Sequence, residues 1–584
     1  MENPERVTYF AATDSRGKRI PFGIKQKDRS RHMYVIGKTG MGKSTMLENM
    51  AIQDMRNGEG LALIDPHGGT AEKLLEYIPE DRIDDVVYFA PFDMEQPIAF
   101  NVMEDVGYDK RHLVVSGLMA TFKKIWQDAW SARMEYILSN TLLALLEYPD
   151  ATLLGVNRMY TDKIYRKRVV DNIKDPLVKD FWTKEFAGFT DRYAQEATPA
   201  IQNKIGQFTS NPLIRNIIGQ PKSSFDIRQM MDQKKILIVN LSKGLVGETN
   251  MQLLGSMLTT RIFLAAMSRA DTQAQSLAKL PNFYFYVDEF QNFANETFAE
   301  ILSEARKYKL NLVIAHQYIE QMDEQVRAAV FGNVGTTVSF RVGPFDAEVL
   351  ETVFMPEFTK EDLVNLGFAQ IYVTLMIDGV GSRPFSAITI PPIEAPARTF
   401  AHEVISASRA RFGHPRSEIE EAVSVELAKT ENEKPSNKKN NKQFSGVSAR
   451  KDFNYKSSEQ SHQQRRKDDI KGKDEQTKNR KFEYVSKQKS SGDLKGILRT
   501  LSQDTKDTKV RSKNTQKESL KNTLAGVLAK SKNNTQNERQ DKEKEQIQQK
   551  KEAPSFEKRA TKEEQQKPFE VPENQLRKIL KGEK

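Results

Sequence analysis

The feature that most constrains this chain is the segment Gly37-Lys38-Thr39-Gly40-Met41-Gly42-Lys43-Ser44, which matches the pattern G-x-x-x-x-G-K-[ST]. It follows the apolar run Met33–Ile36 and precedes a helical pattern over Thr45–Arg56. Glycines let backbone N–H groups face a phosphate, and the following helix adds the positive end of its dipole. Lys43 would supply a mobile charge and Ser44 a Mg²⁺ ligand. The pattern predicts a nucleotide site formed by Gly37, Lys38, Thr39, Gly40, Met41, Gly42, Lys43, Ser44 and Thr45.

Apolar runs of strand length recur along the chain and alternate with helical patterns, which is typical of a parallel α/β sheet. Between them, residues 109–231 show only helical periodicity, which predicts an all-helical insertion. We therefore divide the chain into the first part of an α/β domain (1–108), the insertion (109–231), the second part of the α/β domain (232–398), two C-terminal helices (399–430) and a tail (431–584).

The positive charge of the chain is concentrated in this tail. Residues 431–584 carry a net charge of +16, whereas residues 1–430 carry −6. The tail is rich in Lys, Gln, Asn, Ser and Glu and has few large apolar residues, so it cannot offset the entropy of ordering itself. We expect it to be disordered, and its charge could hold DNA through counterion release.

The tail repeats one short pattern, Leu-[Lys/Arg]-x-[Ile/Thr]-Leu, starting at Leu494, Leu520 and Leu576. Each copy is long enough for about two helical turns, too few to be stable alone. The three copies are either tandem docking motifs for a protein partner or transient helices, and the sequence favours neither.

Composition also limits where the chain works. It has no cysteine, which fits a reducing compartment, and its N-terminus lacks the pattern of a secretory signal. No run of 18 or more apolar residues occurs. We expect a cytoplasmic protein without a transmembrane segment, which associates with a membrane only through a partner.

Two buried strands end in polar residues suited to nucleotide hydrolysis. Asp288 and Glu289 follow a run of apolar and aromatic residues, which places both carboxylates at the carboxyl edge of the sheet. Asp288 would hold Mg²⁺ and Glu289 would polarise the attacking water. Gln317 follows the next strand and would sense the γ-phosphate. Taken alone, Gln317 is more simply an ordinary loop residue.

Arg306 lies at the end of the helix between those two strands. Spacing alone favours a simple role in neutralising the helix C-terminus. The alternative is an arginine finger that reaches the γ-phosphate bound by a neighbouring subunit.

Five segments together resemble the FtsK–HerA branch of hexameric DNA pumps. They are the phosphate loop, Leu63–Gly68, Tyr286–Phe290, Ala305–Tyr308 and Ala315–Gln317. Within that branch the chain is most similar to type IV secretion coupling proteins with a TraG/TraD-type motor domain. The resemblance covers about residues 7 to 430.

This resemblance implies a RecA-like P-loop NTPase sheet interrupted by an all-helical domain, with ATP and Mg²⁺ as ligands. It assigns phosphate and Mg²⁺ roles to Lys43 and Ser44, Walker B roles to Asp288 and Glu289, and the sensor role to Gln317. It also assigns Arg306 the trans-acting role, and therefore implies a homo-hexamer that acts on DNA.

Three points stay open at the level of the sequence. Well-known family members begin with transmembrane helices, whereas this chain begins almost directly at the motor, so a membrane-anchored secretion component would recruit it or it would be a soluble HerA-like DNA-processing helicase. A non-hydrolysing cargo adaptor is the alternative of another class. The basic pairs in the insertion, including Lys123-Lys124, would contact DNA or relaxase-like cargo, although a solvated helix face is the simpler interpretation.

Overall fold

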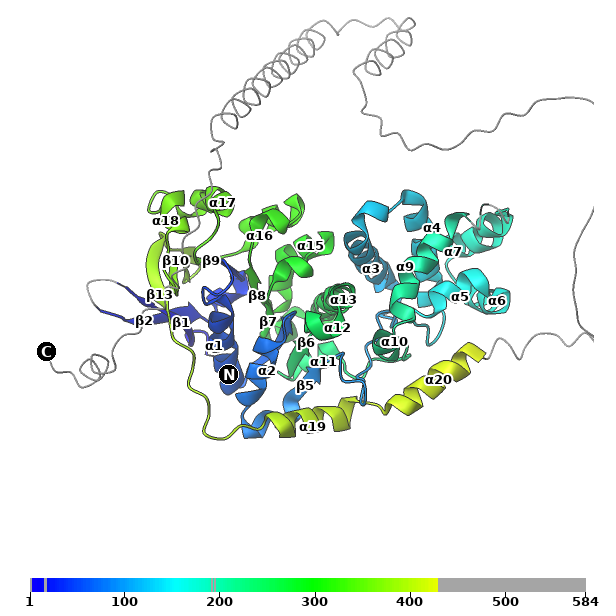
Figure 1. Cartoon of the computed structure of the whole chain (residues 1–584), viewed down its shortest axis with the longest axis horizontal. Coiled ribbons are helices and arrows are strands. Elements are labelled where there is room, and N and C mark those ends of the chain that lie inside the picture. Colours follow the sequence, from blue (N-terminus) through cyan, green and yellow to red (C-terminus); the bar gives the residue numbers. More distant parts are fainter. Residues whose placement is uncertain (1–2, 15–17, 191–192, 194–195, 429–584) are drawn as a thin grey trace, which may run out of the picture. The chain divides into compact units, whose positions relative to one another are not determined.

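A sheet of eleven strands forms the centre of the fold in the computed structural model (Figure 1). In the spatial order of the sheet, neighbouring strands are antiparallel from β2 to β9 and parallel from β9 to β5. A small hairpin of β11 (Met376–Ile377) and β12 (Val380–Gly381) is separate. In spatial order the sheet consists of β2 (Pro21–Lys25), β1 (Val7–Thr13), β13 (Phe385–Thr389), β10 (Gln370–Thr374), β9 (Thr336–Ser339), β3 (Met33–Ile36), β8 (Leu310–His316), β7 (Phe283–Val287), β4 (Gly60–Asp65), β6 (Ile236–Asn240) and β5 (Val86–Phe89).

The structure describes residues 3–14, 18–190, 193 and 196–428. All of these residues belong to the first of two units into which the chain divides, Met1–Ser445 and Gly446–Lys584. The predicted tail and its three leucine motifs, starting at Leu494, Leu520 and Leu576, lie outside the described residues.

Helices cover both faces of the sheet (Figure 1). A short helical turn, η9 (Ala305–Tyr308), precedes β8. The α-helices are α1 (Lys43–Arg56), α2 (Gly69–Glu76), α3 (Arg111–Ile125), α4 (Ala132–Leu146), α5 (Gly155–Thr161), α6 (Lys163–Asn172), α7 (Pro176–Asp180), α9 (Pro199–Thr209), α10 (Pro212–Ile218), α11 (Ile227–Asp232), α12 (Lys243–Val246), α13 (Glu248–Met267), α14 (Ala274–Lys279), α15 (Glu296–Glu304), α16 (Glu324–Asn333), α17 (Pro344–Phe354), α18 (Lys360–Val364), α19 (Ala401–Phe412) and α20 (Arg416–Ala428).

Side chains of the central strands alternate between two cores, as the period of two in a strand requires. In β4, Leu61 and Leu63 pack with α1 and α2, whereas Ala62 and Ile64 face the core that includes α13 and α15. Strands buried on both faces read as continuous apolar runs, which is why the sequence pattern detected them.

The described elements between β5 and β6 are all helical and include α3 to α11, so the predicted α/β fold with a helical insertion is confirmed. The insertion is not a separate globule, because Phe122 of α3 and Leu142 of α4 belong to the same hydrophobic core as Phe285 of the sheet. Helix α3 packs along α13, which follows β6. The domain boundaries stay predictions.

The C-terminal helices run back over the α/β part and the insertion (Figure 1). Helix α19 contacts β5 and α2, and α20 contacts α10. Among the described residues, no helix has both the length and the apolar character needed to cross a bilayer.

Candidate nucleotide site

The phosphate loop lies where β3 ends and α1 begins. Gly42 caps α1 with a φ of 112°, a left-handed conformation that a residue with a side chain rarely adopts. Gly42 thereby lets the chain turn from the phosphate loop into α1, whose N-terminus is the positive end of the helix dipole. The structure confirms the strand, loop and helix context that the pattern requires, and Thr45 lies in the first turn of α1.

Lys43 is buried, and its ammonium group lies across the loop. Its Nζ donates a hydrogen bond to the carbonyl oxygen of Gly37 over 2.7 Å and a longer one to that of Lys38 over 3.4 Å. Burial lowers the pKa of Lys43, although the carboxylates of Glu289 and Asp288 oppose this shift. The three charged groups therefore lie close enough to act on one another.

Ser44 and Asp288 meet directly at this site. Ser44 Oγ donates a hydrogen bond to Asp288 Oδ2 over 3.0 Å. Asp288 is 3% exposed, and its pKa is raised chiefly by burial and further by the neighbouring carboxylates of Glu289 and Asp65. Burial and the two neighbouring carboxylates therefore all act against the ionised form of Asp288.

These two residues fit a bound Mg²⁺. A hydroxyl and a carboxylate oxygen are the hard ligands that Mg²⁺ prefers, and this ion usually takes one or two carboxylates together with substrate phosphates and water. The neighbouring carboxylates of Glu289 and Asp65, which add to the raised pKa of Asp288, would also favour a cation there. Asp65 is engaged elsewhere, because its carboxylate accepts hydrogen bonds from the backbone N–H groups of His67 and Ala71.

Glu289 follows Asp288 in a strained conformation. Its φ of 45° and ψ of 50° lie in the left-handed region, which costs a residue other than glycine about 1–2 kcal/mol. The backbone N–H of Glu289 donates to Asp288 Oδ1 over 2.9 Å, and its Oε2 accepts from Gln291 Nε2 over 2.6 Å. The turn thus separates the directions of two consecutive carboxylates while it holds both at the end of β7.

Gln317 lies between the two halves of the site because β8 lies between β3 and β7. Its Nε2 donates a hydrogen bond to Thr39 Oγ1 in the phosphate loop. The preceding residue, His316, is buried with its Nδ1 3.1 Å from Tyr34 Oη. Burial, together with nearby Lys43 and Lys124, lowers the pKa of His316 to about 3, so this imidazole is neutral at physiological pH.

Arg306 is exposed and lies at the opposite edge of the sheet. It belongs to η9, which precedes the amino end of β8, whereas Gln317 follows the carboxyl end of this seven-residue strand. A strand of that length spans about 20 Å. At the amino edge, Arg306 lies near His32, whose pKa is lowered to about 4 mainly by burial and also by this arginine. The structure therefore brings Lys43, Ser44, Asp288, Glu289 and Gln317 together but keeps Arg306 away from them.

Three residues near the site were missed or given another role. Asp65 and Gln291 adjoin the carboxylates of Asp288 and Glu289. In the sequence, the weak signal for Asp65 is its place as an acid at the end of an apolar run. Lys124 was expected on a solvated helix face, which is wrong. Its Nζ donates to the backbone carbonyl groups of Gln291 and Ala294, and its pKa is lowered to about 8 by burial.

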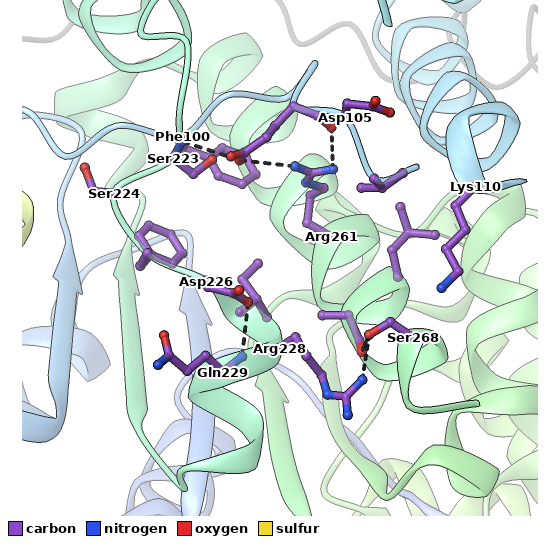
Figure 2. A pocket seen from close by; sticks show the side chains of 16 residues that line it. Phe100, Asp105, Lys110, Ser223, Ser224, Asp226, Arg228, Gln229, Arg261 and Ser268 are labelled. Atoms are coloured by element: carbon purple, nitrogen blue, oxygen red, sulfur yellow. Dashed lines mark hydrogen bonds and ion pairs between the residues drawn. The ribbon is translucent and has the colours of Figure 1, made fainter. Parts of the chain in front are cut away.

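A cavity of about 530 Å³ lies away from this site, between the entry to the insertion, α11 and α13 (Figure 2). None of the residues predicted for nucleotide or Mg²⁺ is among its described lining residues. Its charged side chains are engaged locally, since Arg261 donates to Glu104 and Asp226 caps α11 through the N–H of Gln229. These contacts explain the cavity wall without a ligand.

Comparison with known proteins adds the family. The model of the type IV secretion-system coupling protein DNA-binding domain matches residues 18–350, more than half of the chain. No curated protein matches the chain.

Several solved structures are similar to the chain. Plasmid coupling protein TrwB with a non-hydrolysable GTP analogue is 15% identical, with a TM-score of 0.48, and 69% of this chain and 92% of that chain are covered. TrwB with ADP and Mg²⁺ is 14% identical, with a TM-score of 0.48 and the same coverage. VirB4 of Thermoanaerobacter pseudethanolicus is 14% identical, with a TM-score of 0.44, covering 68% of this chain and 98% of that one.

The matched residues 18–350 contain the phosphate loop, the whole helical insertion, the Walker B carboxylates and Gln317. The match is therefore not confined to a short motif but extends over both halves of the nucleotide site and the insertion between them. The chain belongs to the family of type IV secretion-system coupling proteins.

Proposed function

We propose that the chain hydrolyses ATP at the site around Lys43 and Asp288 and uses the energy to move DNA as a ring-shaped coupling protein in conjugation or type IV secretion. The observation that carries the proposal is the convergence of Ser44 and Asp288, 3.0 Å apart, within a chain of the coupling-protein family. A phosphate-binding helix N-terminus and a buried carboxylate on a neighbouring strand form the two halves of an ATPase site.

Each residue has one task in this proposal. Lys43 and the backbone N–H groups of residues 37–45 bind the phosphates. Ser44 and Asp288 would hold Mg²⁺, which when bound neutralises charge on the phosphate oxygens. Glu289 orients and polarises the attacking water, and Gln317, through its contact with Thr39, links the phosphate loop to β8.

The place of Arg306 supports a ring. A strand length separates it from the site in its own subunit, so its guanidinium group can complete an ATPase site only in a neighbouring subunit. A head-to-tail contact of this kind closes into a ring when every site is completed. We infer a homo-hexamer on this basis and from the family resemblance.

Two features support DNA as the substrate. The matching family model describes a DNA-binding domain. The segment 431–584, with a net charge of +16, would add affinity that falls with salt. Because motor and tail lie in one chain, the tail would raise the local concentration of DNA near the ring.

The test combines ATPase and translocation assays on the purified full-length chain. We expect linear DNA to stimulate ATP hydrolysis, and ATP to drive displacement of a triplex-forming strand from that DNA. Hydrolysis that DNA does not change, or stimulation without strand displacement, would contradict translocation. In cells that carry the cognate secretion system, Lys43→Ala should abolish plasmid transfer.

A further inference from the structure

Lys124 connects the helical insertion to the loop that carries Glu289. It lies in the last turn of α3, and its Nζ donates a hydrogen bond to the backbone carbonyl oxygen of Gln291 over 2.5 Å and another to that of Ala294. Both acceptors lie in the segment that follows β7, within five residues of Glu289. One side chain of the insertion therefore fixes two points of the Walker B loop, which comprises residues 288–294.

The loop passes this restraint to Glu289 itself. Gln291 Nε2 donates to Glu289 Oε2 over 2.6 Å, and the backbone N–H of Asn292 donates to the carbonyl oxygen of Glu289 over 3.0 Å. Among the described residues, Gln291 Oε1 is buried without a hydrogen-bond partner. The side-chain amide of Gln291 thus holds Glu289 while its own Oε1 stays unsatisfied, which is unfavourable for a buried polar atom. The side-chain rotamer of Gln291 therefore depends on the backbone geometry that Lys124 restrains.

Helix α3 is itself firmly placed against α13. Helices α3 and α13 approach so closely that a Cβ on Gly117 would lie 2.5 Å from Thr260 Cγ2. The Walker B loop packs on the same helix, since a Cβ on Gly255 would lie 2.2 Å from the ring of Phe293. The loop is therefore enclosed between α13 and α3, and a shift of α3 moves the group that restrains it.

Lys124 is also an unusual choice for a helix end. A lysine at the last turn normally extends its ammonium group into water, where the charge stays hydrated. Here the group is half-buried and donates to neutral carbonyl oxygens, and burial lowers its pKa. Neutral acceptors compensate a buried charge incompletely, so the contact is retained at a cost to stability.

We propose that Lys124 is a positioning residue through which the helical insertion holds Glu289 in place for ATP hydrolysis. The inference rests on the proposed ATPase function. The position of α3 decides whether Gln291 presents Glu289 to the attacking water. Because the restraint acts on the base alone, it changes the rate of hydrolysis and leaves nucleotide affinity unchanged.

The test uses the full-length chain and compares Lys124→Met with Lys123→Met, which changes the neighbouring exposed lysine on the same helix. For Lys124→Met we expect kcat to fall at least tenfold, because small misplacements of a catalytic group are costly, with the Kd of a non-hydrolysable ATP analogue within twofold of wild type. Lys123→Met should keep both values.

A second variant, Gln291→Met, breaks the same connection without touching α3 and serves if Lys124→Met does not fold. It should also lower kcat, and the double variant should lose no more than the larger single loss, since both act through Glu289. Unchanged kcat in either single variant, or losses that multiply in the double variant, would overturn the proposal. A wild-type chain without ATPase activity would overturn the proposed function as well, whereas an active wild type with unaffected variants would overturn only the role of Lys124.

Discussion

Ser44 Oγ lies 3.0 Å from Asp288 Oδ2, although 244 positions and the whole helical insertion separate the two residues in sequence. Strand order explains the contact, because β3 and β7 flank the single strand β8. Parallel strands end at the same edge, so the turn after β3 and the turn after β7 face one another there. An insertion between two strands does not disturb this edge when its helices join the core on one face of the sheet.

Glu289→Gln should separate nucleotide binding from hydrolysis. The amide cannot accept the proton of the attacking water, whereas Lys43 and the phosphate loop stay unchanged, so we expect kcat to fall about 10²–10⁴-fold. The Kd of ATP should stay within a few-fold of wild type. Glu300→Gln on α15 is the matched control, because Glu300 is exposed, and it should keep full activity. Residual hydrolysis above a tenth of wild type in Glu289→Gln would exclude Glu289 as the base.

Asp288→Asn should stabilise the protein while it removes its response to Mg²⁺. The folded pKa of Asp288 is raised by burial and by neighbouring carboxylates, so its ionised form destabilises the fold at pH values above that pKa. The neutral amide removes this penalty. Its Oδ1 can still accept from the backbone N–H of Glu289, while its Nδ2 can donate to Ser44 Oγ. We expect the Tm at pH 7.5 to rise by roughly 2 °C.

The pH dependence of the Tm of Asp288→Asn tests whether the gain in stability is electrostatic. As pH falls through the raised pKa, Asp288 of the wild type takes up a proton and its penalty disappears, so the difference in Tm between Asp288→Asn and wild type should shrink toward pH 4. Mg²⁺ with ATP should raise the Tm of the wild type and not that of Asp288→Asn. A variant less stable than wild type at pH 7.5 would contradict the electrostatic account.

Much of the central sheet could be predicted from the sequence because its strands are buried on both faces. β4, β6, β7 and β8 appear as short apolar runs, and the structure brings the polar residues that follow β7 and β8 together, while their catalytic roles stay predictions. The antiparallel strands β1, β2, β10 and β13 were missed. They are only partly buried, so they mix polar with apolar residues. Their pairing joins the two ends of the α/β part over more than 350 positions.

Contacts that depend on three-dimensional packing could not be predicted in the same way. Lys123-Lys124 looked like an exposed basic pair, since helical periodicity indicates which residues are apolar but not what the last turn of a helix faces. The packing of α3 on α13 turns Lys124 toward the Walker B loop. Arg306 could be located at a helix end, but only the direction of β8 shows that it lies a strand length from its own site.

Mixed rings should show whether Arg306 acts in trans. Lys43→Ala and Arg306→Ala should each reduce ATP hydrolysis at least a hundredfold. When the two variants are mixed and allowed to exchange subunits, an intact phosphate loop of one meets an intact Arg306 of the other, so activity should reappear. Lys307→Ala is the control at the adjacent position, where the side chain pairs with Glu304. Mixtures no more active than the separate variants would place Arg306 outside the ATPase site.

Truncation after Ala428 should weaken DNA binding mainly through its salt dependence. It removes the segment 431–584 with its net charge of +16. Each DNA phosphate that the protein no longer neutralises reduces the steepness of log K against log salt by about 0.7–0.9 units. We expect a markedly smaller slope for the truncated chain in fluorescence anisotropy with labelled DNA, together with unchanged ATPase activity at saturating DNA. An unaltered slope would show that the tail does not contact the backbone of DNA.

Lys124 should produce an alkaline limb in the pH profile of kcat. Burial lowers its pKa from the usual value near 10.5 to about 8, partly opposed by Asp323. As pH rises through 8 the ammonium group loses its proton, and its two hydrogen bonds to the Walker B loop lose their charge assistance. We therefore expect kcat to decline above pH 8 while nucleotide affinity holds. In Lys124→Arg, which keeps its charge beyond about pH 12, the decline should move to higher pH.

The contribution of Lys124 to the stability of the fold should rise with pH over the range in which kcat falls. A group whose charge stabilises the fold would show the opposite. A lysine with a lowered folded pKa destabilises the folded state while it is charged, and this penalty fades as pH rises from 8 toward the usual lysine value. Relative to Lys124→Met, the wild type should therefore gain Tm between pH 7 and pH 10 as it loses kcat. If Tm and kcat of the wild type fall together over this range, the alkaline limb reflects unfolding and not the loss of the charge on Lys124.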